Sequence, residues 1–163
     1  MRRLLAVAVL VGIAPVCPAA IQNFTISATG AQETPPNASG AAGGGIAIFD
    51  STANTISVSL FFAGLSALAT ASHIHVGAPG VPGPVIVSFV PFTPAATAGI
   101  IVGGPLAFPV ANVPDLFAGH TYFNIHDAVF PGGEIRGQLL PVPEPATIGL
   151  LALGTLAFLS RRR

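Results

Sequence analysis

The sequence predicts an all-β protein, an antiparallel β-sandwich with Greek-key connections. Hydrophobic residues recur with a period of two through the middle of the chain, which is the pattern of half-buried strands. The 163 residues include 19 glycines and 16 prolines, so turns are frequent and long helices are not expected in this region. Charged residues make up only 7% of the chain, so Ser, Thr and Asn must cover much of the surface.

Short strands separated by Gly, Pro and Asn account for most of the body. Alternating or continuous apolar stretches predict strands at residues 24–28, 56–62, 84–91, 98–102, 121–126 and 134–139. A further strand carries His73 and His75. Residues 40–45 fit either a flexible loop or a tight entry into a strand. Residues 77–83 predict a surface loop, and residues 114–119 predict a short helical turn that ends at a glycine.

The first twenty residues have the order of a secretory signal peptide. Two arginines precede an uncharged apolar run at 4–13, and small residues follow up to Ala20. The run is too short for a membrane span, so we expect a signal helix over 1–20 that is removed on export. The only cysteine, Cys17, would be removed with it, and the mature body would then hold no disulfide.

Residues 142–163 form a second segment with three parts. A proline-rich linker precedes an apolar stretch at 147–160, and arginines end the chain. A helix of that length spans about 21 Å, less than the ~30 Å hydrocarbon core of a bilayer. A helix this short would have to thin the bilayer or extend its flanking side chains to the interface. With that adjustment, we expect a short transmembrane helix with its arginines on the cytoplasmic side. The residues that define the pattern are Pro143, Glu144, Pro145, Arg161, Arg162 and Arg163.

This carboxyl-terminal segment closely resembles the PEP-CTERM sorting signal of Gram-negative bacteria. The resemblance rests on the Pro-Glu-Pro triplet, the apolar stretch and the terminal arginines, in that order. It implies recognition by an exosortase, transient anchoring in the inner membrane, and delivery to the cell surface or the extracellular matrix. Such proteins are typical of bacteria that make exopolysaccharide, so the exopolysaccharide matrix is an expected partner.

The body between the two terminal segments is mildly acidic. Residues 21–141 carry one arginine, five carboxylates and no lysine. Nucleic-acid binding needs clustered cations that displace the counterions of the phosphates. The composition therefore argues against a nucleic-acid partner.

Histidines lie on one face of two predicted strands. Side chains at i and i+2 share a face of a strand, so His73 and His75 point the same way. On a later strand, His126 shares its face with Tyr122 and Asn124. Three imidazoles that converge on one point suit Cu or Zn, so these histidines are a candidate metal site. The alternative is that they form the polar face of half-buried strands and bind backbone groups.

Four further residues are candidates to support this site, namely Glu134, Asp127, Arg136 and His120. The two carboxylates and His120 could supply a fourth ligand or orient a histidine. Glu134 and Arg136 share a strand face at i and i+2, which also fits a structural ion pair. Alternatively, Arg136 orders a histidine or recognises an anion. His120 follows a glycine and is alternatively a turn residue.

Four motifs follow one another through the body. They are residues 30–36 (Gly-Ala-Gln-Glu-Thr-Pro-Pro), 72–77 (Ser-His-Ile-His-Val-Gly), 122–126 (Tyr-Phe-Asn-Ile-His) and 131–138 (Pro-Gly-Gly-Glu-Ile-Arg-Gly-Gln). Together they resemble the CHRD domain, which is named for chordin and is widespread in bacterial secreted proteins. The resemblance implies that residues 21–141 are one CHRD domain. The molecular function of that family is poorly defined.

The body is also similar, more distantly, to the copper/zinc superoxide dismutase sandwich. In both, a His-x-His strand is followed much later by a strand with a single histidine. By that analogy His73, His75 and His126 correspond to three copper ligands. The chain departs from that family because it has no bridging histidine in the intervening loop and no cysteine in the mature body. Dismutase activity is therefore the lesser alternative.

Two functional hypotheses follow. The first is an exported, exosortase-sorted protein of the cell surface or matrix whose CHRD domain is a non-catalytic structural or binding module, and not an enzyme. The second is a metal-binding domain, with redox activity as an open question, in which the three histidines hold Cu or Zn. No Ser-His-Asp pattern and no phosphate-binding glycine loop occurs in the sequence, which favours a binding role over catalysis.

Overall fold

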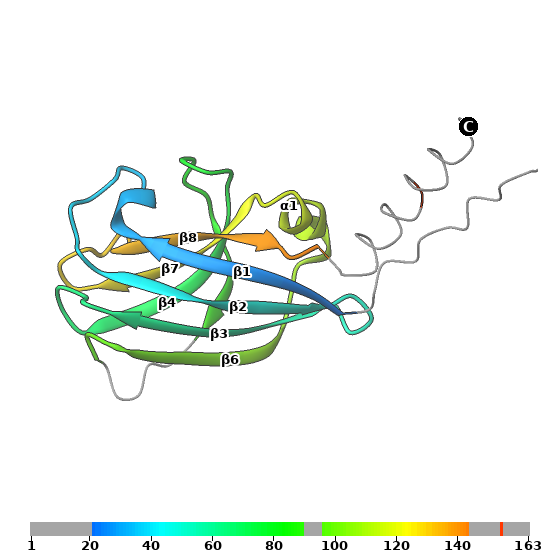
Figure 1. The fold of residues 1–163 in the computed structure, drawn as a ribbon, viewed down its shortest axis with the longest axis horizontal. Helices are drawn as coiled ribbons and strands as arrows, with labels where there is room; N and C mark the ends of the chain where they lie inside the picture. The colour runs from blue at the N-terminus through cyan, green and yellow to red at the C-terminus, as the bar shows by residue number, and fades with distance from the viewer. Residues whose placement is uncertain (1–20, 90–95, 144–153, 155–163) are drawn as a thin grey trace, which may run out of the picture.

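The computed structural model describes residues 21–89, 96–143 and 154, and the elements below lie within them (Figure 1). The strands are β1 (Ile21–Thr29), β2 (Ala42–Asp50), β3 (Thr55–Ala63), β4 (Ala69–Val76), β5 (Val85–Phe89), β6 (Gly99–Ala107), β7 (Thr121–Asp127) and β8 (Ile135–Pro141). The helices are short: η1 (Gly30–Gln32), η2 (Val110–Asn112) and α1 (Val113–Phe117). The all-β class predicted from the sequence is confirmed.

The strands form one antiparallel sheet in the order β5-β4-β7-β8-β1-β2-β3-β6. The sheet curls over itself, so that β4, β7 and β8 form one wall and β2, β3 and β6 form the other (Figure 1). The two edge strands lie close together. Gly103 of β6 is so near the ring of Phe89 of β5 that a Cβ added to it would collide with the ring. The two layers of the expected sandwich are therefore halves of a single, nearly closed sheet.

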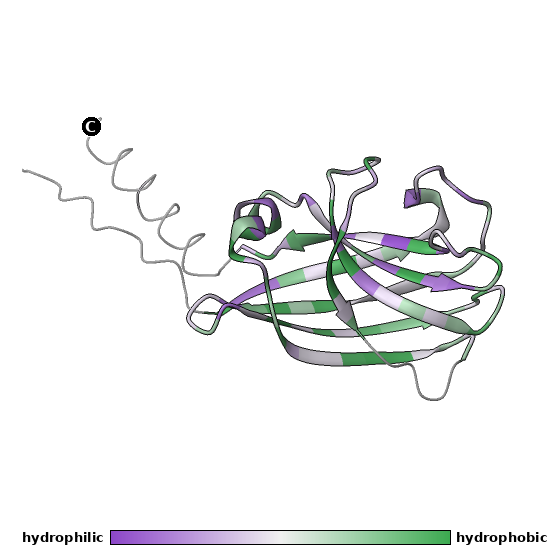
Figure 2. Cartoon of the chain, turned by 180° about the vertical axis from the view of Figure 1, so that it is seen from behind, coloured by the Kyte–Doolittle hydropathy of each residue, from purple (hydrophilic) through white to green (hydrophobic). Residues whose placement is uncertain are grey.

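The period of two builds the apolar core. Alternate residues of every long strand point inward, and Phe24, Ile56 and Phe123 are fully buried. Figure 2 shows the resulting alternation of hydrophobic and hydrophilic residues along the strands. Residues 40–45, for which the sequence left two interpretations, enter a strand at Ala42. At Gly45 any side chain would collide with the backbone of the neighbouring strand β3, so glycine allows this close pairing.

The helix α1 closes one end of this nearly closed sheet, which is called the barrel below. The predicted helical turn is present, and Gly119, with a φ of 71°, follows it in the left-handed region. Leu116 is fully buried in the core. The ring of Phe117 meets Phe24 and Phe49 edge to face, with centroid distances of 5.8 and 6.1 Å. The helix therefore seals the end of the barrel at which β1 begins.

A second, polar layer lies outside the wall of β4, β7 and β8. All but one of the residues of β7 are buried, including those that point away from the apolar core. Tyr122, Asn124 and Arg136 belong to this outward face, and each is at least 95% buried. The segments 30–41 and 77–84 rise from the strands on this side (Figure 1) and donate or accept hydrogen bonds there. The predicted surface loop at 77–83 is thus a cover over polar side chains.

The predicted terminal segments fall largely outside the described residues. This applies to the signal helix at 1–20 and to the apolar stretch and arginines of the sorting segment. Among the described residues, no helix has the length and apolar character needed to cross a membrane.

The burial pattern predicts that Phe→Ala substitutions at two positions differ strongly in their effect on the free energy of unfolding. Phe123→Ala removes a ring that is 0% exposed and should lower the free energy of unfolding by about 3–5 kcal/mol. Phe61→Ala is the matched control, since Phe61 is 61% exposed on the outer face of β3 and should change stability by about 0.5 kcal/mol or less. Urea unfolding of both variants measures the difference. Similar losses in both would contradict the buried placement of Phe123.

Candidate metal site

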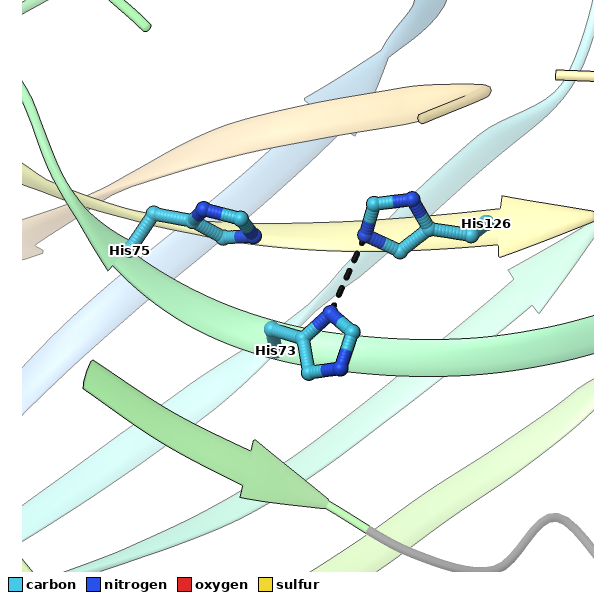
Figure 3. Close-up of side chains that lie close together, drawn as sticks. All are labelled: His73, His75 and His126. Atoms are coloured by element: carbon cyan, nitrogen blue, oxygen red, sulfur yellow. Dashed lines mark hydrogen bonds between the residues drawn. The ribbon is translucent and has the colours of Figure 1, made fainter. Parts of the chain in front are cut away.

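Two neighbouring strands bring the three histidines together. His73 and His75 lie on β4, and His126 lies on the adjacent, antiparallel strand β7. In this register His73 faces Asn124 and His75 faces Tyr122. His126 is therefore diagonal to His73 on the same face, within reach of a ring. Figure 3 shows the three imidazoles pointing toward one another.

The ring nitrogens are close enough to share one ion. One ligand nitrogen from each of the three histidines can be chosen so that all lie within 4.8 Å of one another. His73 Nδ1 lies 3.1 Å from His126 Nε2 (Figure 3). Two imidazole nitrogens on a tetrahedral ion with bonds of 2.0–2.1 Å would stand about 3.3 Å apart. In the metal-free domain this contact is a hydrogen bond that His73 Nδ1 donates, because His126 Nδ1 carries the hydrogen of its own ring. Binding one metal would therefore take ring rotations and, at His73, a change of tautomer that frees Nδ1.

Backbone carbonyls orient two of the rings. His75 Nδ1 donates to Gly83 O at 2.9 Å, and His126 Nδ1 donates to Pro131 O at 3.0 Å. A carbonyl only accepts, so Nδ1 carries the hydrogen in both rings and Nε2 keeps its lone pair. His75 Nε2 is buried and has no hydrogen-bond partner. This arrangement, in which a carbonyl holds the ring by its other nitrogen, is typical of metal-ligating histidines.

Burial keeps these imidazoles neutral at pH 7. Burial, together with the charge interactions with His126 and His75, lowers the pKa of His73 to about 4. Burial also lowers the pKa of His75, partly offset by the bond to Gly83 and reinforced by the charge of Arg136. The pKa of His126 is lowered by burial as well, against the bond to Pro131. Neutral imidazoles are the form that binds metals.

A stack of three side chains fixes the position of His75. Its ring lies parallel to that of Tyr122, with centroids 4.8 Å apart and planes 8° from parallel. The guanidinium of Arg136 lies over the same tyrosine, 3.5 Å from the ring centre. The Tyr122 hydroxyl accepts a hydrogen bond from Gly83 N–H at 3.1 Å. Gly83, whose carbonyl orients His75, therefore also holds Tyr122 in place.

Arg136 connects the two covering segments. It donates to Thr34 Oγ1 at 3.0 Å on one side and to the carbonyls of Ala78 and Val81 at 2.8 and 3.0 Å on the other. It also donates to Gln138 Oε1 on its own strand. Of the expected roles of Arg136, ordering a histidine is the one that its contacts match, through Tyr122 to His75.

The two carboxylates that were expected to support the site accept hydrogen bonds from loop residues. Glu134, fully buried, accepts from the backbone N–H and hydroxyl of Ser66 and from the hydroxyl of Ser39. Asp127 accepts from the backbone N–H groups of Ala67, Val129 and Phe130. Burial acts to raise the pKa of Asp127, but these bonds and one with Glu134 together hold it below its usual value.

These contacts make the carboxylates anchors for loops. The hydrogen bonds of the Glu134 and Arg136 side chains in the described part of the chain go to different partners, so they do not support the expected ion pair between the two residues. Glu134 precedes β8, and the strand alternation that would place it on the face of Arg136 does not extend to it. His120 is exposed in the turn before β7, and its backbone N–H donates to Asp115 O at 2.8 Å. It therefore occupies the turn position that the sequence left as an alternative.

Sequence reasoning did not single out Asn124 and Glu33 as members of the site. Asn124 Nδ2 donates to Glu33 Oε1 at 2.6 Å, and both residues are buried. In the strand register Asn124 lies between His73 and Arg136. Burial raises the pKa of Glu33 to about 7, although Arg136 and the bonds from Thr34 and Asn124 oppose the rise. The signal that could have found Asn124 is its place between Tyr122 and His126 on the polar face of the strand.

Comparison with known families agrees with this architecture. The model of the CHRD domain matches residues 24–139, which is most of the chain and includes every strand-borne residue of the site. The chain belongs to the CHRD domain family. The matched range closely follows the curled sheet, which begins at Ile21 and ends at Pro141, so the CHRD domain and the barrel coincide.

The model of the PEP-CTERM protein-sorting motif matches residues 141–163. The motif marks the chain as an exported protein of the Gram-negative cell envelope that the exosortase machinery sorts. No curated protein and no solved structure shows a match to the chain. The distant similarity to copper/zinc superoxide dismutase therefore stays a prediction.

The lowered pKa values predict how the metal-free domain responds to acid. Below about pH 6.5 the unfolded chain protonates its histidines, whereas folded His73 stays neutral down to about pH 4. At His73 the unfolded state then binds more protons, so the contribution of this residue to stability is complete above pH 6.5 and falls as the pH drops toward 4. Glu33, whose pKa is raised to about 7, acts in the opposite direction over the same range, so the effect of His73 is measured as a difference between variants. Urea midpoints at pH 7.5 and 4.5, with a chelator present, measure this fall.

The matched variants for this experiment are His73→Phe and His120→Phe. The first should lose less stability than the wild type between pH 7.5 and 4.5, because no imidazole is left to titrate at that position while His75 and His126 still do. The second changes an exposed histidine and should keep the wild-type dependence on pH. The same change in midpoint between pH 7.5 and 4.5 in the wild type and in His73→Phe would contradict the partly buried, neutral state of His73.

Proposed function

We propose that this exported protein is a non-catalytic surface module whose CHRD domain binds one Cu or Zn ion through His73, His75 and His126. The observation that carries the proposal is the convergence of three neutral imidazoles from two strands, two of them held by carbonyls through the opposite nitrogen. The unpartnered Nε2 of His75 supports it, because a buried nitrogen lone pair without a partner is rare unless something binds it.

The donor set favours late first-row metals. Three imidazole nitrogens without a thiolate suit Zn and Cu, and divalent copper binds most tightly in the usual order of affinities. The carboxylates that hard ions such as Ca²⁺ prefer are occupied by Ser39, Ser66 and backbone N–H groups. The ion that the site selects is therefore a nitrogen-preferring one.

The sorting motif supports the location of this binding activity. We infer that the chain is transiently anchored in the inner membrane, sorted by an exosortase and displayed at the cell surface or in the exopolysaccharide matrix. The sparsely charged surface and the fully hydrogen-bonded loop anchors suit a structural or binding module. A metal ion that links β4 to β7 would stabilise such a module outside the cell. The mature body is expected to hold no cysteine, so a disulfide could not take that role.

The first prediction of this proposal concerns metal content. The full chain, purified in detergent and dialysed against excess Cu²⁺ or Zn²⁺ and then buffer, should retain close to one ion per chain by inductively coupled plasma mass spectrometry. The His73→Ala/His75→Ala double variant should retain less than a tenth of that amount, because a single imidazole remains. His120→Ala removes an exposed histidine of the same chain and should bind like the wild type.

Two results would contradict the proposal. Wild type that retains neither metal would exclude the site, and a double variant that retains both metals would place binding elsewhere. The non-catalytic role has its own test: the copper-loaded protein should not accelerate superoxide decay beyond an equal concentration of the double variant. Histidine-dependent turnover would overturn that part and favour the redox-active alternative.

A further inference from the structure

Asn124 presents a buried oxygen that no described group satisfies. The residue is 2% exposed, and its Oδ1 is buried without a hydrogen-bond partner. It lies on β7 between Tyr122 and His126, and the strand register sets it beside His73 on one side and Arg136 on the other. A buried carbonyl oxygen without a donor is costly, so its persistence here points to a donor that binds at this place.

The orientation of the amide leaves this oxygen free. Asn124 Nδ2 donates to Glu33 Oε1 at 2.6 Å, which commits the nitrogen side of the amide to the segment 30–41. The backbone at Gly133 has a φ of 129° and passes so close that a Cβ there would collide with Asn124 and Glu33. The turn that carries Gly133 thus holds the amide against Glu33 without giving its oxygen a partner.

Three histidines leave a metal ion with an open position. A tetrahedral Zn or Cu ion held by three imidazoles has room for one more ligand, which in open sites is a water molecule. A metal-bound water is a strong hydrogen-bond donor and needs an acceptor when it is buried. Among the described residues, Asn124 Oδ1 is a buried acceptor without a partner on this face, directly across from His73.

We propose that Asn124 Oδ1 accepts a hydrogen bond from a water bound at the fourth position of the metal, and so reserves that position for small protic oxygen ligands. The inference rests on the proposed metal function. Asn124 acts as a positioning residue, and Glu33 holds it in place. Ligands that carry no hydrogen, such as azide, lose this bond and leave the amide oxygen unpartnered, so the site disfavours them.

Azide competition on the copper-loaded full chain tests the selectivity. In the wild type, azide must displace a water that is bonded to Asn124. In Asn124→Leu the water loses its acceptor, and azide should bind about twofold to tenfold more tightly, the range expected for one hydrogen bond. Asn23→Leu, the same change at an exposed position of β1, should leave the azide affinity unchanged. The azide-to-copper absorption band measures each affinity.

Asn124→Asp guards against a folding defect in the leucine variant. It keeps an oxygen at the same position, so its azide affinity should equal that of the wild type or be lower. Equal azide affinity in the wild type and a folded, copper-loaded Asn124→Leu variant would overturn the inference. So would tighter azide binding in Asn124→Asp, because an acceptor oxygen is still present there.

A measurement on the wild type separates this inference from the proposed function. Pulsed electron-nuclear double resonance of the Cu(II)-loaded chain should detect protons of a directly bound water that vanish in D₂O. Copper bound at one equivalent without such exchangeable protons would overturn the water site and leave the metal site standing. Failure of the wild type to bind copper or zinc would instead overturn the proposed function.

Discussion

The buried guanidinium of Arg136 is the group on which the polar side of the barrel depends. A cation taken out of water is tolerated only when its donors are satisfied and an opposite charge is near. Here the partners are Thr34, two carbonyls of the segment 77–84, and Gln138, and the carboxyl group of Glu33 lies near enough to interact with the cation. Because these partners come from both covering segments, satisfying one side chain closes the layer over β4, β7 and β8.

That closure determines the surroundings of the histidines. The segment 77–84 contains Gly83, whose carbonyl orients His75 and whose N–H donates to Tyr122. The same covering segments partly bury the imidazoles, which lowers their pKa values and keeps them neutral. The histidine cluster and the buried cation are therefore parts of one polar layer, and neither arrangement would persist with the loops open.

The strand alternation predicted much of this architecture. It assigned Tyr122, Asn124 and His126 to one face of their strand, and the structure places them opposite the buried Phe123 and Ile125. This works because side-chain direction in a strand is a local property of the backbone. The pairing of β4 with β7 was within reach for the same reason, since two strands with matching polar faces could lie side by side.

The loops limited what the sequence could predict. The partners of Glu134 are Ser39 and Ser66, which lie 95 and 68 positions away along the chain. No periodicity relates them, because a loop follows no repeating direction and its contacts depend on the finished barrel. Asn124 was assigned to the polar face, but its contact with Glu33, 91 positions earlier, depends on how the segment 30–41 folds back.

The stack beneath the histidines also gives the protein an optical property. Tyr122 is the only tyrosine of the chain, and the sequence has no tryptophan. Its ring centroid lies 4.8 Å from that of His75 and under a guanidinium, so the tyrosine fluorescence of this chain comes from one place. The ultraviolet emission of the molecule is therefore a local signal, sensitive to the charge and electron configuration of whatever His75 touches, and it needs no added dye.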